Sequence, residues 1–458
     1  MQRLELPYTT TARPYFATLA NEVGAIWFHS GNPAREGHRW EWCSAWPETR
    51  YRMLDNQQVE CEQQGQTTLI DTPDFLSWLA ARQPNPVTGC DLPFSSGLAG
   101  HLNYEAGYGL HGLTSRHPSP TCLASIDRYE WSLVLDHQQQ RAFLCVSEHL
   151  SDSLRQRVMA WYETVRRRPP TPEVPPPIES LAWRSGMSRE TYQQHFAALK
   201  EYILAGDIYQ ANLTRPWYAD IEPGVSDWSV YSHLIDRIQA PYAVYHRAAD
   251  HTLMSVSPER FITIDQGHIT TQPIKGTRPR GASPDEDQRL SQALEHSEKD
   301  RAENLMIVDL LRNDISRNAR VGSVKVPELC KPVAFSNVHH LVSTITADLA
   351  TGSTPLDVLR DAFPGGSITG APKRRAMEII DELEVCARGP YCGTAFWLSD
   401  NGSFDSNILI RSLLRTPGQL MCSGGGGIVA DSIADDEYEE SATKVAHILN
   451  ALGTVSGG

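Results

Sequence analysis

Six prolines fall within residues 169–177, directly after the triplet Arg166-Arg167-Arg168. Proline fixes φ and has no N–H, so such a run forms neither a helix nor an interior strand. Proline-rich segments are instead stiff and extended. We therefore predict a linker at 169–187, which separates an N-terminal region at 1–168 from a C-terminal region at 188–455.

The composition is that of a large folded protein. The chain has 458 residues, of which 40% are hydrophobic, and a net charge of −14. This length allows two to three domains or one large α/β unit. The acidic balance argues against a surface for nucleic acid or anionic membrane. No apolar run is long enough for a membrane span, and the first residues lack a signal core, so we expect a cytoplasmic protein. The nine cysteines form no C-x-x-C pair and are expected to be reduced.

The hydrophobic pattern predicts a mixture of strands and helices. In the N-terminal region, Asp74 is placed to cap a helix, and residues 131–136 and 141–146 are typical of a hairpin. In the C-terminal region, Ser188 is expected to cap a helix that ends at Gly206. The strands expected after it lie at 207–213, 242–246, 253–256, 261–264 and 268–271.

Two predicted helices carry regularly spaced carboxylates. The helix at 300–314 has Asp300 and Glu303 one turn apart. A second helix, which Asp435-Asp436 would cap, carries one polar stripe of Glu437, Glu440 and Lys444. One interpretation is a solvated helix face with a Glu440–Lys444 ion pair. The other is that both helices present carboxylates to one cation, for which hard oxygen ligands favour Mg²⁺ over zinc.

Two glycine-rich segments lie between these helices, and both are predicted to be loops. Residues 363–373 precede a helix that begins near Pro372, so their amides are placed to face an anion at a helix N-terminus. Residues 423–428 include four consecutive glycines, as a backbone-lined carboxylate pocket would require. Tight turns are the ordinary alternative. Arg411, at the end of a strand expected at 407–410, is suited to bind a carboxylate with two hydrogen bonds.

The pentapeptide Pro273-Ile274-Lys275-Gly276-Thr277 places a lysine between isoleucine and glycine. By itself it is typical of a surface turn. Glu259 lies in a turn between two predicted strands, where a solvated carboxylate is the ordinary interpretation. His339-His340 opens an apolar strand at 341–345, where a core or capped histidine is usual.

Taken together, these motifs resemble those of the chorismate-binding family, which includes anthranilate, aminodeoxychorismate, isochorismate and salicylate synthases. The resemblance covers residues 188–452, with several motifs in family order. It implies an α/β (α+β) fold in which two β-sheets pack as a sandwich surrounded by helices. It also implies that the N-terminal region, similar to that of anthranilate synthase component I, contributes strands to one intertwined unit.

The resemblance implies a set of site residues. Glu303 and Glu440 would bind Mg²⁺, and Asp300 and Glu437 would hold water bound to it. His340 would lie beside the reacting ring. The chorismate anion would be bound by Tyr391, Arg411, the amides of Gly425, Gly426 and Gly427, Ser367 or Thr369, and Lys444. This local positive charge would reconcile an anionic substrate with a net charge of −14.

Two positions distinguish the branches of the family. Isochorismate and salicylate synthases carry a water-activating lysine where this chain has Gln210, and anthranilate synthases carry alanine where it has Lys275. The P-I-K-G-T motif resembles the aminodeoxychorismate branch. That branch converts chorismate and ammonia to 4-amino-4-deoxychorismate, for 4-aminobenzoate and folate biosynthesis.

In that branch Lys275 would attack C2 of chorismate as the 4-hydroxyl leaves, with Glu259 as general acid, and ammonia would then displace the lysine by attack at C4. Lowering the pKa of a lysine from about 10.4 to about 7.5 corresponds to roughly 4 kcal/mol of disfavoured charge. Arg278, Arg280 and Mg²⁺ are the neighbours we expect to contribute.

The resemblance also implies partners. The sequence has no G-x-C-x-G glutaminase elbow, so ammonia would come from a separate glutamine amidotransferase subunit. Relatives hold tryptophan near the matches to Ser30, Pro241 and Tyr242, although the N-terminal motif here departs from the usual form. Three alternatives stay open: an anthranilate synthase component I, a non-catalytic chorismate- or tryptophan-binding regulator, and an unrelated lysine enzyme that forms Schiff bases.

Overall fold

The structure is a computed structural model that describes residues 1–31, 39–84, 86, 90–171, 178–334 and 338–455. Most of the proline-rich run, residues 172–177, lies outside the described residues, so the linker stays a prediction.

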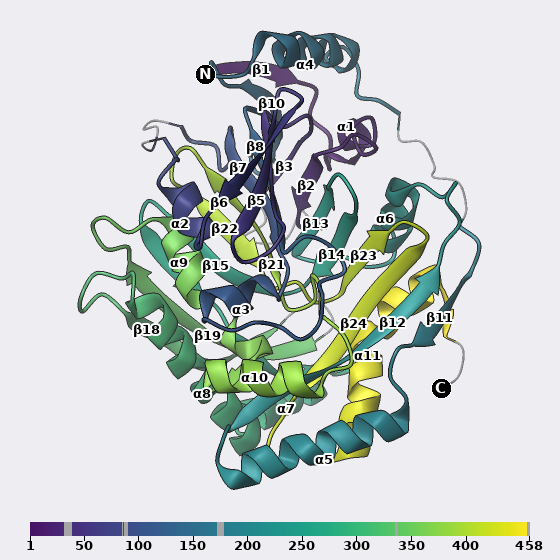
Figure 1. The fold of residues 1–458 in the computed structure, drawn as a ribbon, viewed down its shortest axis with the longest axis vertical. Coiled ribbons are helices and arrows are strands. Elements are labelled where there is room, and N and C mark those ends of the chain that lie inside the picture. Colours follow the sequence, from purple (N-terminus) through teal and green to yellow (C-terminus); the bar gives the residue numbers. More distant parts are fainter. Residues whose placement is uncertain (32–38, 85, 87–89, 172–177, 335–337, 456–458) are drawn as a thin grey trace.

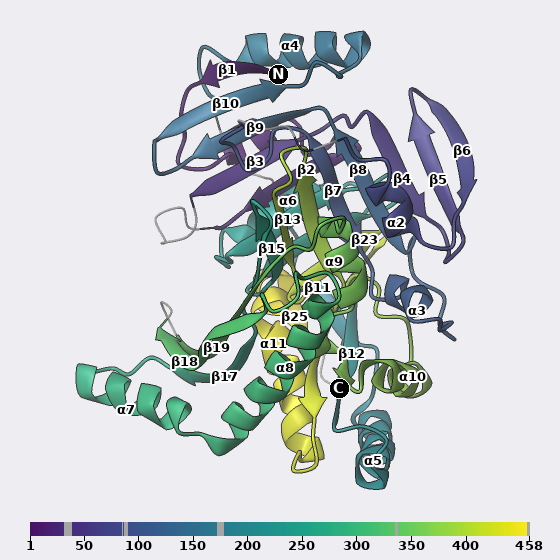
Figure 2. The same ribbon diagram turned by 90° about the vertical axis from the view of Figure 1, so that its left-hand side faces the viewer.

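The described strands form two large β-sheets (Figures 1 and 2). The first sheet, in spatial order, consists of β1 (Gln2–Leu6), β10 (Arg141–Val146), β9 (Trp131–Asp136), β3 (Trp40–Ser44), β2 (Ala25–His29), β13 (Tyr242–Arg247), β14 (Thr252–Ser257), β23 (Ser412–Thr416), β24 (Gln419–Ile428), β12 (Gln210–Asp220), β11 (Leu181–Ser185) and β25 (Gly453–Val455), with β20 (Gly370–Ala371) paired to β12. The second consists of β17 (Ile274–Pro279), β19 (Val338–Asp348), β16 (His268–Thr271), β15 (Arg260–Asp265), β22 (Phe404–Asn407), β21 (Thr394–Ser399), β7 (Gly97–Leu102), β8 (Ala124–Tyr129), β4 (Thr49–Met53), β5 (Gln58–Gln63) and β6 (Gln66–Asp71), with β18 (Lys325–Ala334) paired to β19.

Each sheet contains strands from both sides of the proline-rich run. In the first sheet β2 pairs antiparallel with β13, and in the second β7 pairs antiparallel with β21. The N-terminal region therefore supplies strands to both sheets, and the expectation of one intertwined unit is confirmed.

The two sheets pack face to face. Ile26 and Trp42 from the first sheet share a buried apolar cluster with Ala99 and Tyr129 from the second. A larger cluster covers the other face of the first sheet, and another joins the second sheet to its helices. The helices lie outside the sheets, so the predicted sandwich is confirmed (Figure 1). They are α1 (Arg13–Phe16), α2 (Phe75–Ala80), α3 (Ala106–Leu110), α4 (Asp152–Val165), α5 (Arg189–Ala205), α6 (Asp227–Ile235), α7 (Pro284–Glu295), α8 (Glu298–Ser316), α9 (Pro355–Ala362), α10 (Lys373–Leu383) and α11 (Ala434–Leu452), with a 3₁₀ turn at Gly366–Ile368.

Several predicted ends of elements are confirmed. The Asp74 carboxylate accepts a hydrogen bond from the Ser77 amide at 3.0 Å and caps α2. Ser188 caps α5, which ends at Gly206 with φ +84°, a conformation that favours glycine. The hairpin expected at 131–136 and 141–146 is β9 and β10.

Three local predictions are wrong. Residues 423–428 are part of β24 and not a loop, because they pair residue by residue with β12, whose backbone supplies their hydrogen bonds. The strand expected at 407–410 already ends at Asn407. The N-cap of α11 is Ile433. Asp435-Asp436 lie in the first turn, where their negative charges interact favourably with the positive end of the helix dipole.

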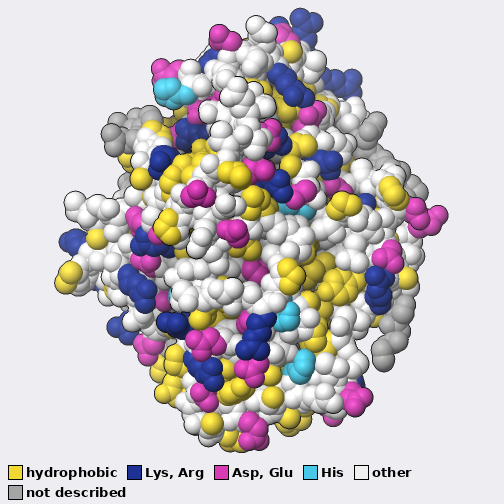
Figure 3. Space-filling model, in the orientation of Figure 1, with side chains coloured by type: hydrophobic (Ala, Val, Ile, Leu, Met, Phe, Trp, Pro, Cys, Tyr) yellow, Lys and Arg dark blue, Asp and Glu magenta, His cyan; other side chains and the backbone are white. Residues whose placement is uncertain are grey.

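None of the helices in the described part of the chain is long and apolar enough to span a membrane. Figure 3 shows Lys and Arg interspersed with Asp and Glu over the face seen in Figure 1.

Candidate active site

Lys275 lies on β17, opposite Leu341 of β19. The pairing shifts register between Lys275 and Thr277, and Gly276 has φ +73°. A Cβ at Gly276 would lie 2.8 Å from Leu294 Cδ1 and 2.9 Å from Asp300 Oδ1. Only glycine therefore allows this strand to lie so close to the start of α8.

The Lys275 ammonium makes no hydrogen bond or ion pair with another described residue. Burial lowers its pKa, the carboxylates of Glu303 and Glu259 oppose that shift, and Lys444 adds to it. The expected neighbours Arg278 and Arg280 are instead paired with Asp300 and Asp287 respectively. The protein cation that lowers the pKa of Lys275 is thus Lys444, on α11.

Glu259 lies in the turn between β14 and β15. Its amide donates to Ser257 Oγ at 3.2 Å and its carbonyl accepts from the Ile408 amide at 3.1 Å, so its backbone is fixed. Burial raises the pKa of its carboxyl to about 7, against the charges of Lys275 and Arg411. A carboxyl with this pKa carries a proton in a large fraction of molecules at neutral pH and suits a general acid.

The predicted metal ligands come from α8, which lies beside β17 (Figure 2), and from α11, which lies beside β24 (Figure 1). The charges of Glu303 on α8 and Glu440 on α11 both raise the pKa of Lys275, against the effect of burial. Glu303 makes no hydrogen bond or ion pair with another described residue, whereas Glu440 is 2.7 Å from Lys444 Nζ. The predicted Glu440–Lys444 ion pair is therefore present, and both side chains are exposed to solvent.

The two other predicted ligands are engaged by neighbours. Asp300 Oδ2 accepts from Arg278 at 2.9 Å, and Glu437 Oε1 accepts from Ser432 Oγ at 2.7 Å. Burial raises the pKa of Glu437, and the like charge of Glu440 adds to this. A Cβ at Gly426 of β24 would lie 2.8 Å from Glu437 Oε2, so glycine there allows α11 to approach.

Carboxylate oxygens are the type of ligand that a hard divalent cation prefers. Among the residues that the structure describes, no three of the four carboxylates have their oxygens within 4.8 Å of one another. Mg²⁺ keeps several waters and takes only one or two protein carboxylates, so the cation site stays a prediction.

Tyr391 and Arg411 lie on adjoining segments, because the amide of Cys392 donates to the Leu409 carbonyl at 2.8 Å. Tyr391 is buried, and burial raises the pKa of its hydroxyl well above the usual value. Arg411 has φ +52°, and its carbonyl accepts from the Val256 amide at 3.1 Å. The Arg411 side chain is exposed and makes no ion pair with a described residue, as a carboxylate clamp requires.

The remaining predicted anion ligands differ in the hydrogen bonds that they already make within the chain. Lys444 Nζ donates to the Gly425 carbonyl at 3.0 Å. Thr369 is fully buried and its hydroxyl donates to the Gly365 carbonyl at 3.0 Å, whereas Ser367 is half-buried and makes no such bond. Ser367 is therefore the better placed of the two for an anion.

Gln210 and His340 flank the site from two strands. Gln210 opens β12, is 1% exposed and has no partner for its Oε1 among the described residues. A Cβ at Gly427 would lie 2.4 Å from its Nε2. His340 Nδ1 lies 3.0 Å from Thr277 Oγ1, on the strand that carries Lys275. His339, its neighbour, is buried and bonds Asp287 at 2.8 Å.

A buried ion pair beneath the site was not predicted. Arg388 is 2% exposed and binds Glu384 through two hydrogen bonds of 2.9 and 2.7 Å. It also donates to the carbonyls of Ile368 at 3.0 Å and Asn212 at 2.9 Å. This pair ties the segment that holds Ser367 to β12. The i, i+4 spacing of Glu384 and Arg388 is a signal for it, but one shared with many surface helix pairs.

Ser30, Pro241 and Tyr242 line one cavity of about 450 Å³ between the two sheets. Three tryptophan side chains, those of Trp40, Trp42 and Trp397, line it as well. The structure therefore brings the three predicted pocket residues together.

Residues 25–450 match the family described as chorismate binding enzyme. The chain belongs to this family. It is 42% identical to aminodeoxychorismate synthase component 1 of Salmonella typhimurium, over 96% of each chain. It is 41% identical to the protein of the same name from Escherichia coli, over 96% of this chain and 95% of that one. The crystal structure of anthranilate synthase component I from Streptococcus pneumoniae is similar in fold, with a TM-score of 0.79 at 26% identity over 91% of this chain and 93% of that one.

Proposed function

We propose that this chain converts chorismate and ammonia to 4-amino-4-deoxychorismate. The observation that carries the proposal is the setting of Lys275, an amine with a lowered pKa and no ion-pair partner among the described residues, beside a carboxyl whose pKa is about 7. Support also comes from relatives named aminodeoxychorismate synthase component 1, which align with nearly the whole chain.

In the first step neutral Lys275 attacks C2 of chorismate. The C2–N bond forms, the two ring double bonds shift, and the C4–O bond breaks. Glu259 donates a proton to the departing 4-hydroxyl, which leaves as water. In the second step ammonia attacks C4, the double bonds shift back, and the C2–N bond to Lys275 breaks. The enolpyruvyl group stays intact.

The remaining residues bind and orient. Arg411, Tyr391, Ser367, Lys444 and the amides of Gly425 to Gly427 would hold the substrate carboxylates. Glu303 and Glu440 would hold Mg²⁺, with Asp300 and Glu437 bonding water bound to it; the cation would supply positive charge next to the substrate anion. Gln210 carries no base, which disfavours attack by water in place of ammonia.

The proposed source of ammonia is a separate glutamine amidotransferase subunit, which the component 1 naming of the relatives favours. Within this chain, burial raises the pKa of both Cys392 and Cys422 to about 12, so neither thiol is suited to act as a glutaminase nucleophile. Adding such a subunit should make activity depend on glutamine, whereas the isolated chain should require ammonium.

Tryptophan is a further proposed ligand, for the cavity lined by Ser30, Pro241 and Tyr242. Its aromatic walls suit an indole ring. Calorimetric titration with tryptophan should give saturable binding that a Ser30→Trp variant abolishes by filling the space.

One reaction tests the proposed activity directly. Purified protein is incubated with chorismate, Mg²⁺ and ammonium, and the product is identified by mass. The proposal expects 4-amino-4-deoxychorismate. Fluorescent anthranilate would identify the anthranilate synthase alternative instead, and no turnover at all would favour a binding regulator.

A further inference from the structure

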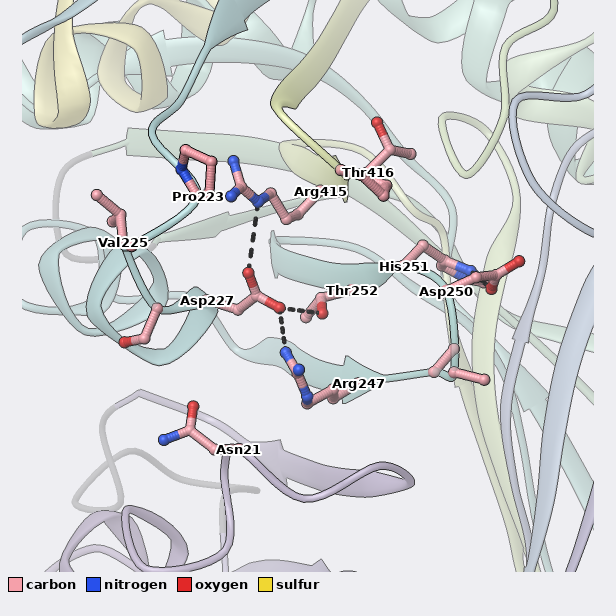
Figure 4. Close-up of a pocket in the computed structure, with 15 residues that line it drawn as sticks. Asn21, Pro223, Val225, Asp227, Arg247, Asp250, His251, Thr252, Arg415 and Thr416 are labelled. Atoms are coloured by element: carbon pink, nitrogen blue, oxygen red, sulfur yellow. Dashed lines mark hydrogen bonds and ion pairs between the residues drawn. The ribbon is translucent and has the colours of Figure 1, made fainter.

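A second cavity, of about 530 Å³, is built from other residues than the candidate active site (Figure 4). Its walls come from the segment before and at the start of α6, the turn between β13 and β14, and the end of β23, with Asn21 at one side. Cavities of about 300–1,000 Å³ are typical of small-molecule sites.

Two arginines in this cavity share one carboxylate. Asp227 Oδ2 accepts hydrogen bonds from Arg247 Nη1 and from Thr252 Oγ1, the latter at 2.5 Å, and Arg415 Nε lies 3.5 Å from Asp227 Oδ1. Figure 4 shows the Asp227 carboxylate between the two guanidinium groups. Two positive charges and one negative charge leave a local excess of positive charge, in a chain whose net charge is −14.

Arg415 has unused hydrogen-bonding capacity. It is only 8% exposed, yet it makes no hydrogen bond to any described residue, and its Nη1 is buried without a partner. Arg388, which is 2% exposed, makes four hydrogen bonds in the same protein. A guanidinium has five N–H donors, and leaving buried donors unmade is costly. The contacts of Arg415 with described residues therefore leave a buried hydrogen-bond donor of its guanidinium unsatisfied.

The other charges around the cavity do not compensate Arg415. Asp250, on the rim, is held by Arg52 at 2.6 Å and by His251 at 2.7 Å. The N-terminus of α6, capped by Ser226, also faces the cavity and adds a positive partial charge.

We propose that this cavity binds a small oxyanion, the carboxylate or phosphate group of a metabolite-sized ligand, through Arg415 and Arg247. A planar guanidinium matches both groups with paired hydrogen bonds. The proposal is independent of the proposed reaction, because its readout is binding and not turnover.

The test titrates the full chain with inorganic phosphate and, separately, with acetate, at constant ionic strength maintained with sodium chloride. Binding is followed by thermal unfolding and by calorimetry. We expect a saturable rise in the unfolding midpoint, and the anion that binds tighter identifies the class of group. No saturable effect of either anion would overturn the proposal.

Variants locate the site. Arg415→Gln should weaken the apparent affinity at least tenfold. Arg184→Gln, which removes an exposed arginine paired with Asp220, should leave it unchanged. Arg411→Gln should also leave it unchanged, which excludes binding at the candidate active site.

A substitution at the rim keeps the test valid if Arg415→Gln does not fold. Asn21 is exposed beside the cavity, so Asn21→Asp adds a negative charge without disturbing buried contacts. It should weaken anion binding at least threefold. Full affinity in this variant, or in a folded Arg415→Gln variant, would contradict the assignment.

Discussion

At Lys275, burial and carboxylates act on the pKa in opposite directions, and burial is the larger effect. Burial also raises the pKa of Glu259, the general acid of the proposed reaction. Groups whose pKa values are shifted by burial and by a specific charged neighbour are typical of functional sites. Sequence reasoning identified both residue types, but burial, which sets both shifts, depends on the fold.

Glu259→Gln tests the acid at the residue scale. Because the pKa of Glu259 is about 7, activity of the wild-type protein with ammonia should fall as the pH rises above 7 and the carboxyl loses its proton. The kcat of the variant should be lower by about 100-fold or more. The variant should also not show the fall in activity above pH 7. The measurement is the pH profile of kcat. Glu163→Gln, on the exposed face of α4, is the control. A variant with the wild-type profile would contradict the role of Glu259.

His29 is a residue whose ionisation should affect stability. It lies at the end of β2, stacked on Trp27 with ring centroids 3.8 Å apart, and bonds the Tyr231 hydroxyl at 2.8 Å. Burial lowers its pKa from 6.5 to about 4. The unfolded chain therefore binds more protons than the folded chain below pH 6.5, and stability is lost as the pH falls from 6.5 toward 4.

The expected loss from His29 is about 3 kcal/mol of unfolding free energy at pH 4. Urea unfolding of the wild-type protein and of His29→Gln at pH 7 and pH 4 measures it. The variant should be less sensitive to acid by that amount. Equal acid sensitivity in both proteins would show that His29 does not titrate in this way.

At the scale of elements, the pattern of hydrophobic residues predicted the hairpin β9–β10, helix α5 and strands β13 to β16 well. These elements have local signals, such as the cap at Ser188 and the turn at Gly206. The prediction of a loop at the glycine run in β24 was wrong because glycine has a low intrinsic preference for strands. The strand forms here because β12 pairs with it and α11 packs close against it. Contacts with β12 and α11, and not local preference, therefore place this segment in a strand.

Gly426→Ala tests this contact. The added Cβ would lie 2.8 Å from Glu437 Oε2, so the carboxylate or α11 must move. We expect the Mg²⁺ concentration for half-maximal activity to rise at least tenfold, with a smaller effect on folding. Magnesium titration of activity and thermal unfolding measure the two. Thr443→Ala, on the exposed side of the same helix, is the control. An unchanged Mg²⁺ requirement would show that Gly426 of β24 does not affect metal binding.

At the scale of the whole molecule, the candidate site depends on segments far apart in the chain. Glu259 lies in the turn between β14 and β15, Lys275 on β17, Glu303 on α8 and Glu440 on α11. Residue spacing predicted each carboxylate pair within its helix but not that the helices meet. Only the family resemblance implied it. The Arg388–Glu384 pair has only its i, i+4 spacing as a sequence signal and the Arg415 cavity has none, so both required the structure.

The interleaved sheets predict that the C-terminal region does not fold alone. Without β2 and β7, strands β13 and β21 would lose partners in the interior of both sheets. A fragment of residues 188–458 should aggregate and show no cooperative thermal transition, and co-expression with residues 1–187 should restore one. Circular dichroism and size-exclusion chromatography measure this. A soluble fragment with a sharp transition would support an independent domain after the linker.

The most direct test of the account is the covalent intermediate on Lys275. The protein is incubated with chorismate and Mg²⁺ without ammonia, denatured mildly, and its intact and peptide masses are measured. We predict an increase equal to chorismate less one water, on the peptide that contains Lys275, present in the control Lys325→Ala and absent in Lys275→Ala. No adduct, together with full ammonia-dependent activity in Lys275→Ala, would contradict the nucleophilic role of Lys275.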